Sequence, residues 1–358
     1  MYYPLKFEPQ YKNNIWGGRN LESLGKILPE GKIAESWEVS CQKNSISTIA
    51  NGIFKGLSLL DLIKSTGSNV IGSDFVQQKK IEFPLLFKLI DANEKLSVQV
   101  HPDDKYAYIH ENEDSGKHEA WYIVYAKAGA QIVYSVIPGV DKDCFAKAIK
   151  QNEVILQLNY VNVFTGDVIN ICPGILHAIG EGIVVAEIQQ NSNITYRVFD
   201  YDRVDDKGIK RPLQLEKAMD VILFNTTGNK VKYEGLEVQI DEDTSLTYKL
   251  ANEFFSVEIL KVDGNIDQNA DGSRFYIYYI IEGKAMIYYE NGYTSLDKGE
   301  SMLIPASMGK YILSGKFLAL KTYVPNIEEN ILLPLIAAHY SAKEILESVF
   351  DSAETIQN

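Results

Sequence analysis

Short apolar or alternating runs make up most of the chain, and Gly, Pro, Asn or Asp lie beside most of them. Runs of this kind predict β-strands, and the clearest are “KIAESWEVS” at 32–40, “FPLLFKLID” at 83–91, “KLSVQV” at 95–100, “EAWYIVYA” at 119–126, “AQIVYSVI” at 130–137, “DVINICP” at 167–173 and “GIVVAEIQQ” at 182–190. Apolar residues at helical spacing predict helices within 56–65, 141–152 and 212–224. We therefore expect a mainly β chain with a few helices.

A weak internal repeat indicates that one β-rich unit occurs twice. Segments 120–134 and 165–179 together resemble 278–312, because each copy has a β-run, a Gly turn and a second β-run, then Gly followed by an acid, an apolar run and Pro. Repeats indicate a duplicated unit, and this one is typical of a small antiparallel jelly-roll barrel, the cupin. We predict two cupin-type jelly-roll barrels, in domains 1–235 and 236–358, with a partly helical tail in the second.

Histidine separates the two copies of this unit. The first copy contains His101, His118 and His177, whereas no histidine lies between Tyr233 and Asn326 in the second. Only the first barrel is therefore predicted to hold a histidine-rich metal site, and the second is predicted to bind no metal.

Composition narrows the class of partner. The 358 residues are 46% hydrophobic, which is enough for a large core, and the formal net charge is −13. Such a charge should repel nucleic acid and anionic membranes, so an anionic substrate would need a locally positive pocket. The three cysteines show no CxxC spacing, no apolar run is long enough to span a bilayer, and the N-terminus lacks the pattern of a signal peptide. We expect a cytoplasmic protein; the oligomeric state is not indicated.

A row of polar residues interrupts the apolar pattern at “LSVQVHPDD”. Ser97, Gln99 and His101 alternate with valines, so they share one strand face, and neighbours on that face lie about 6.5–7 Å apart. This row is either the wet side of a sheet or one wall of a site. With Glu119 in “GKHEAWYIV” and His177 in “PGILHAIG”, it supplies the imidazole, carboxylate and amide groups that suit an open zinc site, although such ligands do not exclude other divalent ions.

Other histidines are weaker candidates for this site. His118 competes with its neighbour Glu119, but the two point to opposite faces of an extended segment. His110 lies in an acidic polar stretch and His339 in the tail, where surface or packing roles are expected. The alternative for His101 and His177 is that they only cap strand ends.

Several motifs together resemble the type I mannose-6-phosphate isomerases, most closely the short bacterial branch without the large helical insertion. They are “FPLLFKLIDANEKLSVQVHPDD”, “GKHEAWYIV”, “PGILHAIGEGIVVAEIQQNSNITYRVFDYDR”, “NIWGGRNL” and “IAESWEVS”. The resemblance extends motif by motif over roughly residues 1–220 and beyond them by architecture.

The resemblance implies a role for each matching residue. It implies one zinc ion per chain, held by Gln99, His101, Glu119 and His177. A further group of side chains corresponds to functional positions of the family: the active-site arginine Arg197, the acidic pocket residue Glu187, the substrate-binding candidates Lys88, Ser97 and Lys117, and the phosphate-linked cation Arg203.

Two positions depart from the long-form enzymes. This chain reads Gly116-Lys117-His118-Glu119 where they read His-Lys-Pro-Glu, and it has Asn193 where they have aspartate. Parts in ring opening or proton transfer have been assigned to both positions, so either another group opens the sugar ring here or those assignments do not apply to the short branch.

The reaction implied is the interconversion of mannose 6-phosphate and fructose 6-phosphate, with a small sugar phosphate as the only partner expected. A base would remove the C2 proton, an enediolate would form, and the proton would return at C1, with zinc and Arg197 stabilising the negative charge. Lys117 is the favoured base and Glu187 the alternative. Lys117 could instead be a solvated loop residue, and Arg203 could be paired only with nearby aspartates.

Other function classes remain open at this point. A non-catalytic sugar-binding or regulatory cupin would need a degraded site, which the retained ligand set and Arg197 argue against. Another cupin isomerase, such as a phosphoglucose isomerase, does not match the order of the motifs.

Overall fold

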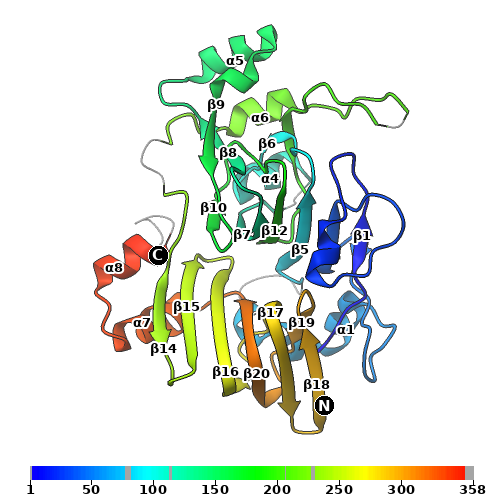
Figure 1. The fold of residues 1–358 in the computed structure, drawn as a ribbon, viewed down its shortest axis with the longest axis vertical. Coiled ribbons are helices and arrows are strands. Elements are labelled where there is room, and N and C mark those ends of the chain that lie inside the picture. Colours follow the sequence, from blue (N-terminus) through cyan, green and yellow to red (C-terminus); the bar gives the residue numbers. More distant parts are fainter. Residues whose placement is uncertain (1, 77–81, 113–114, 206, 227–229, 351–358) are drawn as a thin grey trace.

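The computed structural model describes residues 2–76, 82–112, 115–205, 207–226 and 230–350 (Figure 1). Its strands outnumber its helices, so the expectation of a mainly β chain is confirmed. The helices are α1 (Leu59–Thr66), α2 (Ser68–Ile71), α3 (Ser73–Val76), α4 (Asp104–His110), α5 (Lys142–Gln151), α6 (Leu215–Val221), α7 (Leu333–Ala337) and α8 (Ala342–Val349), together with the 3₁₀ turns η1 (Asn20–Leu24) and η2 (Val154–Gln157) and the π-helical η3 (Ile327–Leu332). No helix in these described ranges is long and apolar enough to cross a membrane.

A six-stranded sheet forms the centre of the N-terminal half. Its strand order is β1-β2-β5-β12-β7-β10, with bounds β1 (Gln10–Lys12), β2 (Glu35–Val39), β5 (Leu85–Ala92), β7 (Glu119–Ala126), β10 (Val168–Ile171) and β12 (Ile183–Gln190). β5 and β12 are buried along their whole length, because both faces of the sheet are covered. This double burial explains why their sequences are nearly continuous apolar runs rather than alternating ones.

A second, five-stranded sheet packs against one face of the first. Its order is β13-β6-β11-β8-β9, with bounds β6 (Val98–Val100), β8 (Gln131–Val136), β9 (Leu158–Asn162), β11 (His177–Ala178) and β13 (Tyr196–Phe199). Val98 and Val100 belong to a core cluster that includes Phe145 of α5 and Ala218 of α6. The valines therefore face the covering helices, and the polar row that alternates with them faces the space between the two sheets.

The C-terminal half contains a seven-stranded sheet and a helical tail. The main strand order is β14-β15-β16-β20-β17-β18, and β19 pairs with β17; the bounds are β14 (Leu236–Gln239), β15 (Thr244–Ala251), β16 (Ser256–Ala270), β17 (Tyr276–Tyr289), β18 (Gly292–Asp297), β19 (Ser301–Ile304) and β20 (Gly309–Thr322). The tail helices bury Ile331, Leu335 and Ile345 with Tyr248 of β15, so the predicted helical tail is confirmed. A small hairpin, β3 (Cys41–Gln42) and β4 (Ser45–Ile46), completes the strands.

The two halves share one hydrophobic core. The ring centroids of Phe83 and Phe275 are 4.8 Å apart, and those of Phe87 and Tyr279 are 5.8 Å apart. All four residues belong to a single cluster between the six-stranded and seven-stranded sheets. The predicted boundary at residue 235 thus separates two sheets in sequence, but this core cluster continues across it, beside clusters that belong to one half alone.

The internal repeat corresponds to a shared pairing pattern. In the first copy β10 pairs antiparallel with β7, with Val168 opposite Tyr122; in the second, β19 pairs antiparallel with β17, with Met302 opposite Tyr278. The pairing orders among the described residues form open sheets rather than a closed barrel. The duplicated unit is therefore visible in strand pairing, and its description as two jelly-roll barrels stays a prediction.

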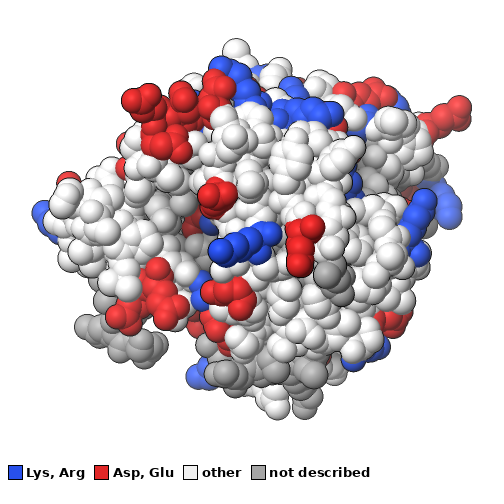
Figure 2. All heavy atoms as spheres, turned by 90° about the horizontal axis from the view of Figure 1, so that it is seen from below, with Lys and Arg blue, Asp and Glu red and all other residues white. Residues whose placement is uncertain are grey.

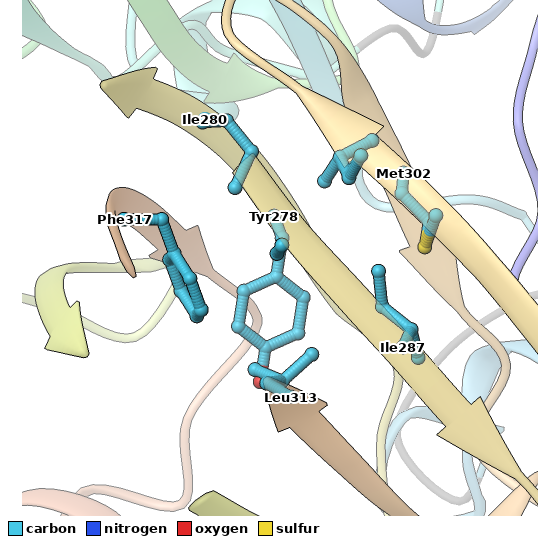
Figure 3. A pocket seen from close by; sticks show the side chains of 8 residues that line it. Tyr278, Ile280, Ile287, Met302, Leu313 and Phe317 are labelled. Carbon is cyan, nitrogen blue, oxygen red and sulfur yellow. The ribbon is translucent and has the colours of Figure 1, made fainter. Parts of the chain in front are cut away.

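The interior of the seven-stranded sheet is filled by apolar side chains. Figure 3 shows Tyr278, Ile280, Met302, Leu313 and Phe317 converging on a cavity of only about 10 Å³, which leaves room for at most about one water molecule. On the face of the molecule seen from below, acidic and basic side chains are interspersed with uncharged surface (Figure 2). The cavity inside this sheet is too small to hold a small-molecule substrate.

The shared core makes a prediction about stability. Phe87→Ala removes a fully buried ring from between the two sheets and should lower the free energy of unfolding by about 3–5 kcal/mol. Phe164→Ala is the matched control, because this phenylalanine is 64% exposed. Urea unfolding monitored by circular dichroism measures both, and equal losses in the two variants would show that the ring at 87 does not join the sheets.

Candidate active site

Strand register places three polar side chains in one row across the five-stranded sheet. Gln99 of β6 is opposite His177 of β11 on one side and opposite Arg197 of β13 on the other. Directly opposed residues share a face of a sheet, so all three side chains project into the interior of the sandwich. The backbone thus builds half of a site from residues far apart in sequence.

The six-stranded sheet supplies the facing half. Glu187 of β12 is opposite Lys88 of β5 and Trp121 of β7, and Glu119 lies two residues before Trp121 on the same face. Trp121 donates a hydrogen bond from Nε1 to Glu187 Oε2 at 3.0 Å. Both carboxylates are almost fully buried, with Glu119 0% and Glu187 2% exposed, so the chemistry lies inside the sandwich.

Two histidines and a carboxylate converge between the sheets. His101 Nε2 is 3.4 Å from Glu119 Oε2, and His177 Nε2 is 3.3 Å from Glu119 Oε1. One ligand atom from each of the three residues lies within 4.8 Å of the other two, which makes them a group that could hold a metal ion. The Gln99 amide is 3.3 Å from His177 Nε2, and rotation of the amide exchanges its nitrogen for the oxygen that a cation would need.

The bonding of these residues fits a metal ion. Neither ring nitrogen of His101 and neither carboxylate oxygen of Glu119 makes a hydrogen bond of good geometry, although all four atoms are buried. His177 donates from Nδ1 to the carbonyl of Ile175 at 2.8 Å, which leaves Nε2 facing the group. Buried polar atoms normally have partners. Apart from the contact of Lys117 Nζ with Glu119 Oε2 at 2.8 Å, the histidine and carboxylate atoms of this group face one another, as ligands of one cation would.

Protonation also suits metal binding. Burial and the positive charge of Lys117 lower the pKa of His101 to about 3, and burial lowers the pKa of His177 as well. Burial alone would raise the pKa of Glu119, but Lys117 and His101 outweigh it and hold that pKa well below its usual value. Neutral imidazoles and an ionised carboxylate are the forms that bind a cation.

Charges alternate along a buried row that leads to this group, which we call the charge ladder: Glu35, Lys88, Glu187, Lys117 and Glu119. Lys88 Nζ is 3.7 Å from Glu35 and 2.8 Å from Glu187, and Lys117 Nζ is 3.8 Å from Glu187 and 2.8 Å from Glu119 Oε2. Burial would lower the pKa of Lys88, but the carboxylates of Glu187 and Glu35 raise it overall. Burial and the charge of Glu119 raise the pKa of Glu187.

The segment that carries Lys117 is held from two sides. The backbone N–H of His118 donates to Gln190 Oε1 at 2.8 Å, and the N–H of Gly116 donates to Asp104 Oδ1 at 2.8 Å. The His118 ring points away from the metal-ligand group, as expected, and packs against Phe254 and Phe255 of the C-terminal half. Lys117 is only 3% exposed, so the alternative of a solvated loop lysine is wrong.

A large cavity opens beside this group. Its volume is about 680 Å³, within the usual range for small-molecule sites. The charged side chains on its wall are six cations and two carboxylates, namely Lys12, Lys43, Lys88, Lys117, Arg197, Arg211, Glu35 and Glu187. The wall is therefore positive inside a chain of net charge −13, which is the pocket that an anionic substrate requires.

The structure brings together most, but not all, of the residues expected from the sequence. Lys88, Ser97, Gln99, Lys117, Glu187 and Arg197 all line the cavity, and Arg197 donates from Nε to Ser97 Oγ at 3.2 Å. Arg203 is not among the lining residues and donates from Nη2 to Asp200 Oδ1 at 2.6 Å, which agrees with the alternative of local pairing. The expected contact between Arg203 and the substrate phosphate stays a prediction, and the location of Arg203 outside the cavity wall does not support it.

Sequence reasoning missed other residues of the wall. They are Arg211, Lys12, Asn14, Trp16, Trp37 and Thr195, among others. Trp16 and Trp37 lie in the motifs “NIWGGRNL” and “IAESWEVS”, which could have marked them. Arg211 lies in no motif, and only the path of the chain after β13 brings it to the cavity.

Comparison with known proteins shows to which family the chain belongs. The model of the phosphomannose isomerase type I catalytic domain matches residues 5–132, and that of the mannose-6-phosphate isomerase cupin domain matches residues 244–324. The mannose-6-phosphate isomerase ManA of Bacillus subtilis is 35% identical over 314 residues, which cover 87% of this chain and 96% of the relative. The chain belongs to the type I mannose-6-phosphate isomerase family. It is an enzyme of that family.

Further relatives extend the match over most of the chain. The mannose-6-phosphate isomerase of Streptococcus mutans is 33% identical over 317 residues, covering 87% of this chain and 95% of the relative. The crystal structure of the mannose 6-phosphate isomerase from Bacillus subtilis superposes with a TM-score of 0.80 at 32% identity, covering 90% of this chain and 99% of that one. The family resemblance expected from the motifs is confirmed.

One departure from the long-form members of the family has a steric cause. A Cβ atom added to Gly116 would lie 2.4 Å from the backbone atoms Asp103 C and Asp104 N, so this backbone accepts no histidine there. The second departure, Asn193, lies exposed on the cavity wall. The backbone at position 116 therefore excludes any larger side chain, and the role of Asn193 stays a prediction.

The ligand group predicts how metal content responds to mutation. His101→Ala and His177→Ala should each lose most of the bound divalent ion, because each removes one of few donors; elemental analysis of purified protein measures it. His110→Ala, which alters an exposed histidine of α4, should keep the wild-type content of one ion per chain. Full metal content in both site variants, or two ions in the wild type, would contradict this assignment.

Proposed function

We propose that the enzyme interconverts mannose 6-phosphate and fructose 6-phosphate in a zinc-dependent reaction through an enediolate. The observation that carries the proposal is the convergence of His101, Glu119 and His177 beside a positively charged cavity. The relatives that this chain resembles are named mannose-6-phosphate isomerases. The cavity can hold a hexose phosphate, and its charge selects an anion.

Zinc would be held by Gln99, His101, Glu119 and His177. Two imidazoles and a carboxylate are ligand types of catalytic zinc sites, and the Gln99 amide oxygen would add a fourth ligand. When bound, zinc would supply electrophilic stabilisation of negative charge on the substrate oxygens.

The side chains of the protein would then divide the remaining work. The Arg197 guanidinium, next to Gln99 in register, would hold the enediolate oxygens by charge-assisted hydrogen bonds that strengthen as the charge develops. Ser97 and Lys88 would bind hydroxyl groups of the open-chain sugar. The burial of the charge ladder would keep water away from the reacting carbons.

Lys117 is the proposed base that moves the proton from C2 to C1, and Glu187 is the alternative. Lys117 Nζ lies beside the metal-ligand group, 2.8 Å from Glu119 Oε2, and its side chain lines the cavity. Glu187 is engaged by Lys88 and Trp121, which ties up both of its oxygens. These contacts favour Lys117.

The finer expectations from sequence remain part of this proposal. They are a catalytic cupin domain over 1–235, a cupin-like domain without metal over 236–358, and a cytoplasmic location. The apolar filling of the seven-stranded sheet supports the second of them.

The decisive experiment is a coupled assay for fructose 6-phosphate formation from mannose 6-phosphate, with and without a chelator. Activity that is lost on chelation and returns with zinc supports the proposal. A non-catalytic sugar-binding cupin would bind the sugar phosphate without turnover, so binding without product, at full zinc content, would replace the proposed function by that alternative.

Removal of Arg197 should affect turnover more than substrate affinity. Arg197→Ala should lower kcat about 10²–10³-fold with a smaller change in KM, because one preorganised donor to the developing charge is lost. Arg197→Lys should recover part of the rate, since it keeps the charge but not the planar fork. Arg19→Ala, on an exposed arginine paired with Glu22, is the control; near-normal kcat in Arg197→Ala with full zinc would make Arg197 a structural residue.

The identity of the base can be tested by a pair of variants. If Lys117 moves the proton, Lys117→Met should abolish exchange of the C2 proton with solvent deuterium, measured by nuclear magnetic resonance, while Glu187→Gln should retain part of it. The reverse pattern, at equal zinc content, would assign the base to Glu187.

A further inference from the structure

We infer that Arg211 forms the subsite for the phosphate group of the substrate, on the cavity wall that also carries Arg197. The inference rests on the proposed function and deepens it, since it names the residue that sets specificity for a phosphorylated sugar. It also differs from the expectation from sequence, in which Arg203 has this role.

A tight reversal of the chain brings Arg211 to the cavity. After β13, Tyr201 and Asp202 both adopt left-handed backbone conformations, with φ of 55° and 54°, which non-glycine residues seldom do. The chain then returns beside β13. The N–H of Gln214 donates to the carbonyl of Arg197 at 2.9 Å, and the N–H of Arg197 donates to Gln214 Oε1 at 2.9 Å.

A buried aspartate orients the guanidinium. Arg211 donates from Nε to Asp200 Oδ2 at 2.8 Å and from Nη2 to Asp200 Oδ1 at 2.5 Å, while Nη1 lies 3.3 Å from Asn14 Oδ1. Asp200 is 6% exposed, so the pair is rigid at its inner side. These contacts leave N–H groups on Nη1 and Nη2 for a further acceptor, and Arg211 lines the cavity.

Arg203 shares the same aspartate but is directed elsewhere. Its Nη2 donates to Asp200 Oδ1 at 2.6 Å, its Nη1 donates to the carbonyl of Lys95, and its guanidinium lies 5.2 Å from the Tyr201 ring centroid. It does not line the cavity. Asp200 thus anchors two arginines and directs only Arg211 towards the substrate space.

The charge of Arg211 favours an anion beside it on the wall. The guanidinium of Arg197 lies close enough to Arg211 that, after burial, the charge of Arg211 is the largest influence lowering the pKa of Arg197. Like charges brought together in a half-buried wall repel each other, and a dianionic phosphate would turn this repulsion into attraction. Guanidinium groups match phosphate oxygens in pairs.

Arg211 and the metal-ligand group contact different parts of the wall. Arg197 lies opposite Gln99 in register and contacts Ser97, whereas Arg211 contacts Asn14. The reacting carbons and the phosphorus lie at opposite ends of an open-chain hexose 6-phosphate. Lys12, another cation on the wall, is engaged by the Ser45 hydroxyl and lies over the Trp37 ring, so it is less available.

The test compares Arg211→Gln with Arg203→Gln. Because the phosphate does not change during the reaction, Arg211→Gln should raise KM for mannose 6-phosphate about 10- to 100-fold with little change in kcat. Calorimetry with inorganic phosphate should show a similar loss of affinity. Arg211→Lys should recover part of both, and Arg203→Gln should have the smaller effect on each.

Two controls keep the result specific. Lys210→Gln removes one positive charge from the neighbouring residue, which is exposed and paired with Asp202, and thus measures general electrostatic attraction. Thermal melting and zinc content verify that each variant is folded. A larger effect in Arg203→Gln, an equal effect in Lys210→Gln, or unchanged phosphate affinity in Arg211→Gln would overturn the inference.

Failure of this inference can be told apart from failure of the proposed function. If the wild type forms no fructose 6-phosphate, the proposed reaction fails, while the calorimetric comparison with inorganic phosphate still decides the role of Arg211. If the wild type is active and the phosphate affinity of Arg211→Gln is unchanged, only the subsite fails.

Discussion

The burial of Glu119 and Glu187 between two sheets is the constraint on which the site depends. Moving an ionised carboxylate from water into the protein interior costs several kcal/mol of free energy unless an opposite charge lies against it. The structure meets this demand with Lys117 and Lys88, which alternate with the carboxylates. Every strand that borders the site must then hold its register, because a shift by one residue would turn each of these charges into an apolar core.

Part of this arrangement could be predicted from the sequence. Lys88 interrupts the apolar run “FPLLFKLI”, and a buried lysine needs an acidic partner; in the structure it pairs with Glu187. The sequence predicted that the polar residues of β6 share one strand face, but it did not predict whether that face was exposed to solvent. That answer depends on α5 and α6, which cover the valine face, and no local pattern states which face a distant helix will cover.

Other features depend on tertiary structure alone. Arg203 and Arg211 both follow Asp200 in sequence and both pair with it, so charge pattern does not distinguish them. The reversal of the chain at Tyr201 and Asp202 distinguishes them, but the residue types at these two positions do not predict a reversal. Likewise, the sequence alone suggests that Gly116 replaces a functional histidine. The structure shows that the backbone of Asp103 and Asp104 lies too close to position 116 for any larger side chain.

The position of His118 has a consequence for how the molecule can be divided. Its ring packs on Phe254 and Phe255 and lies 3.4 Å from the Asn252 amide, while its neighbour Lys117 lines the cavity and contacts Glu119. One short stretch of chain thus has its reactive side in one half of the protein and its supporting side in the other. The N-terminal half is consequently not a transferable catalytic module: excised from the C-terminal sheet, it would present the back of its own active site to solvent.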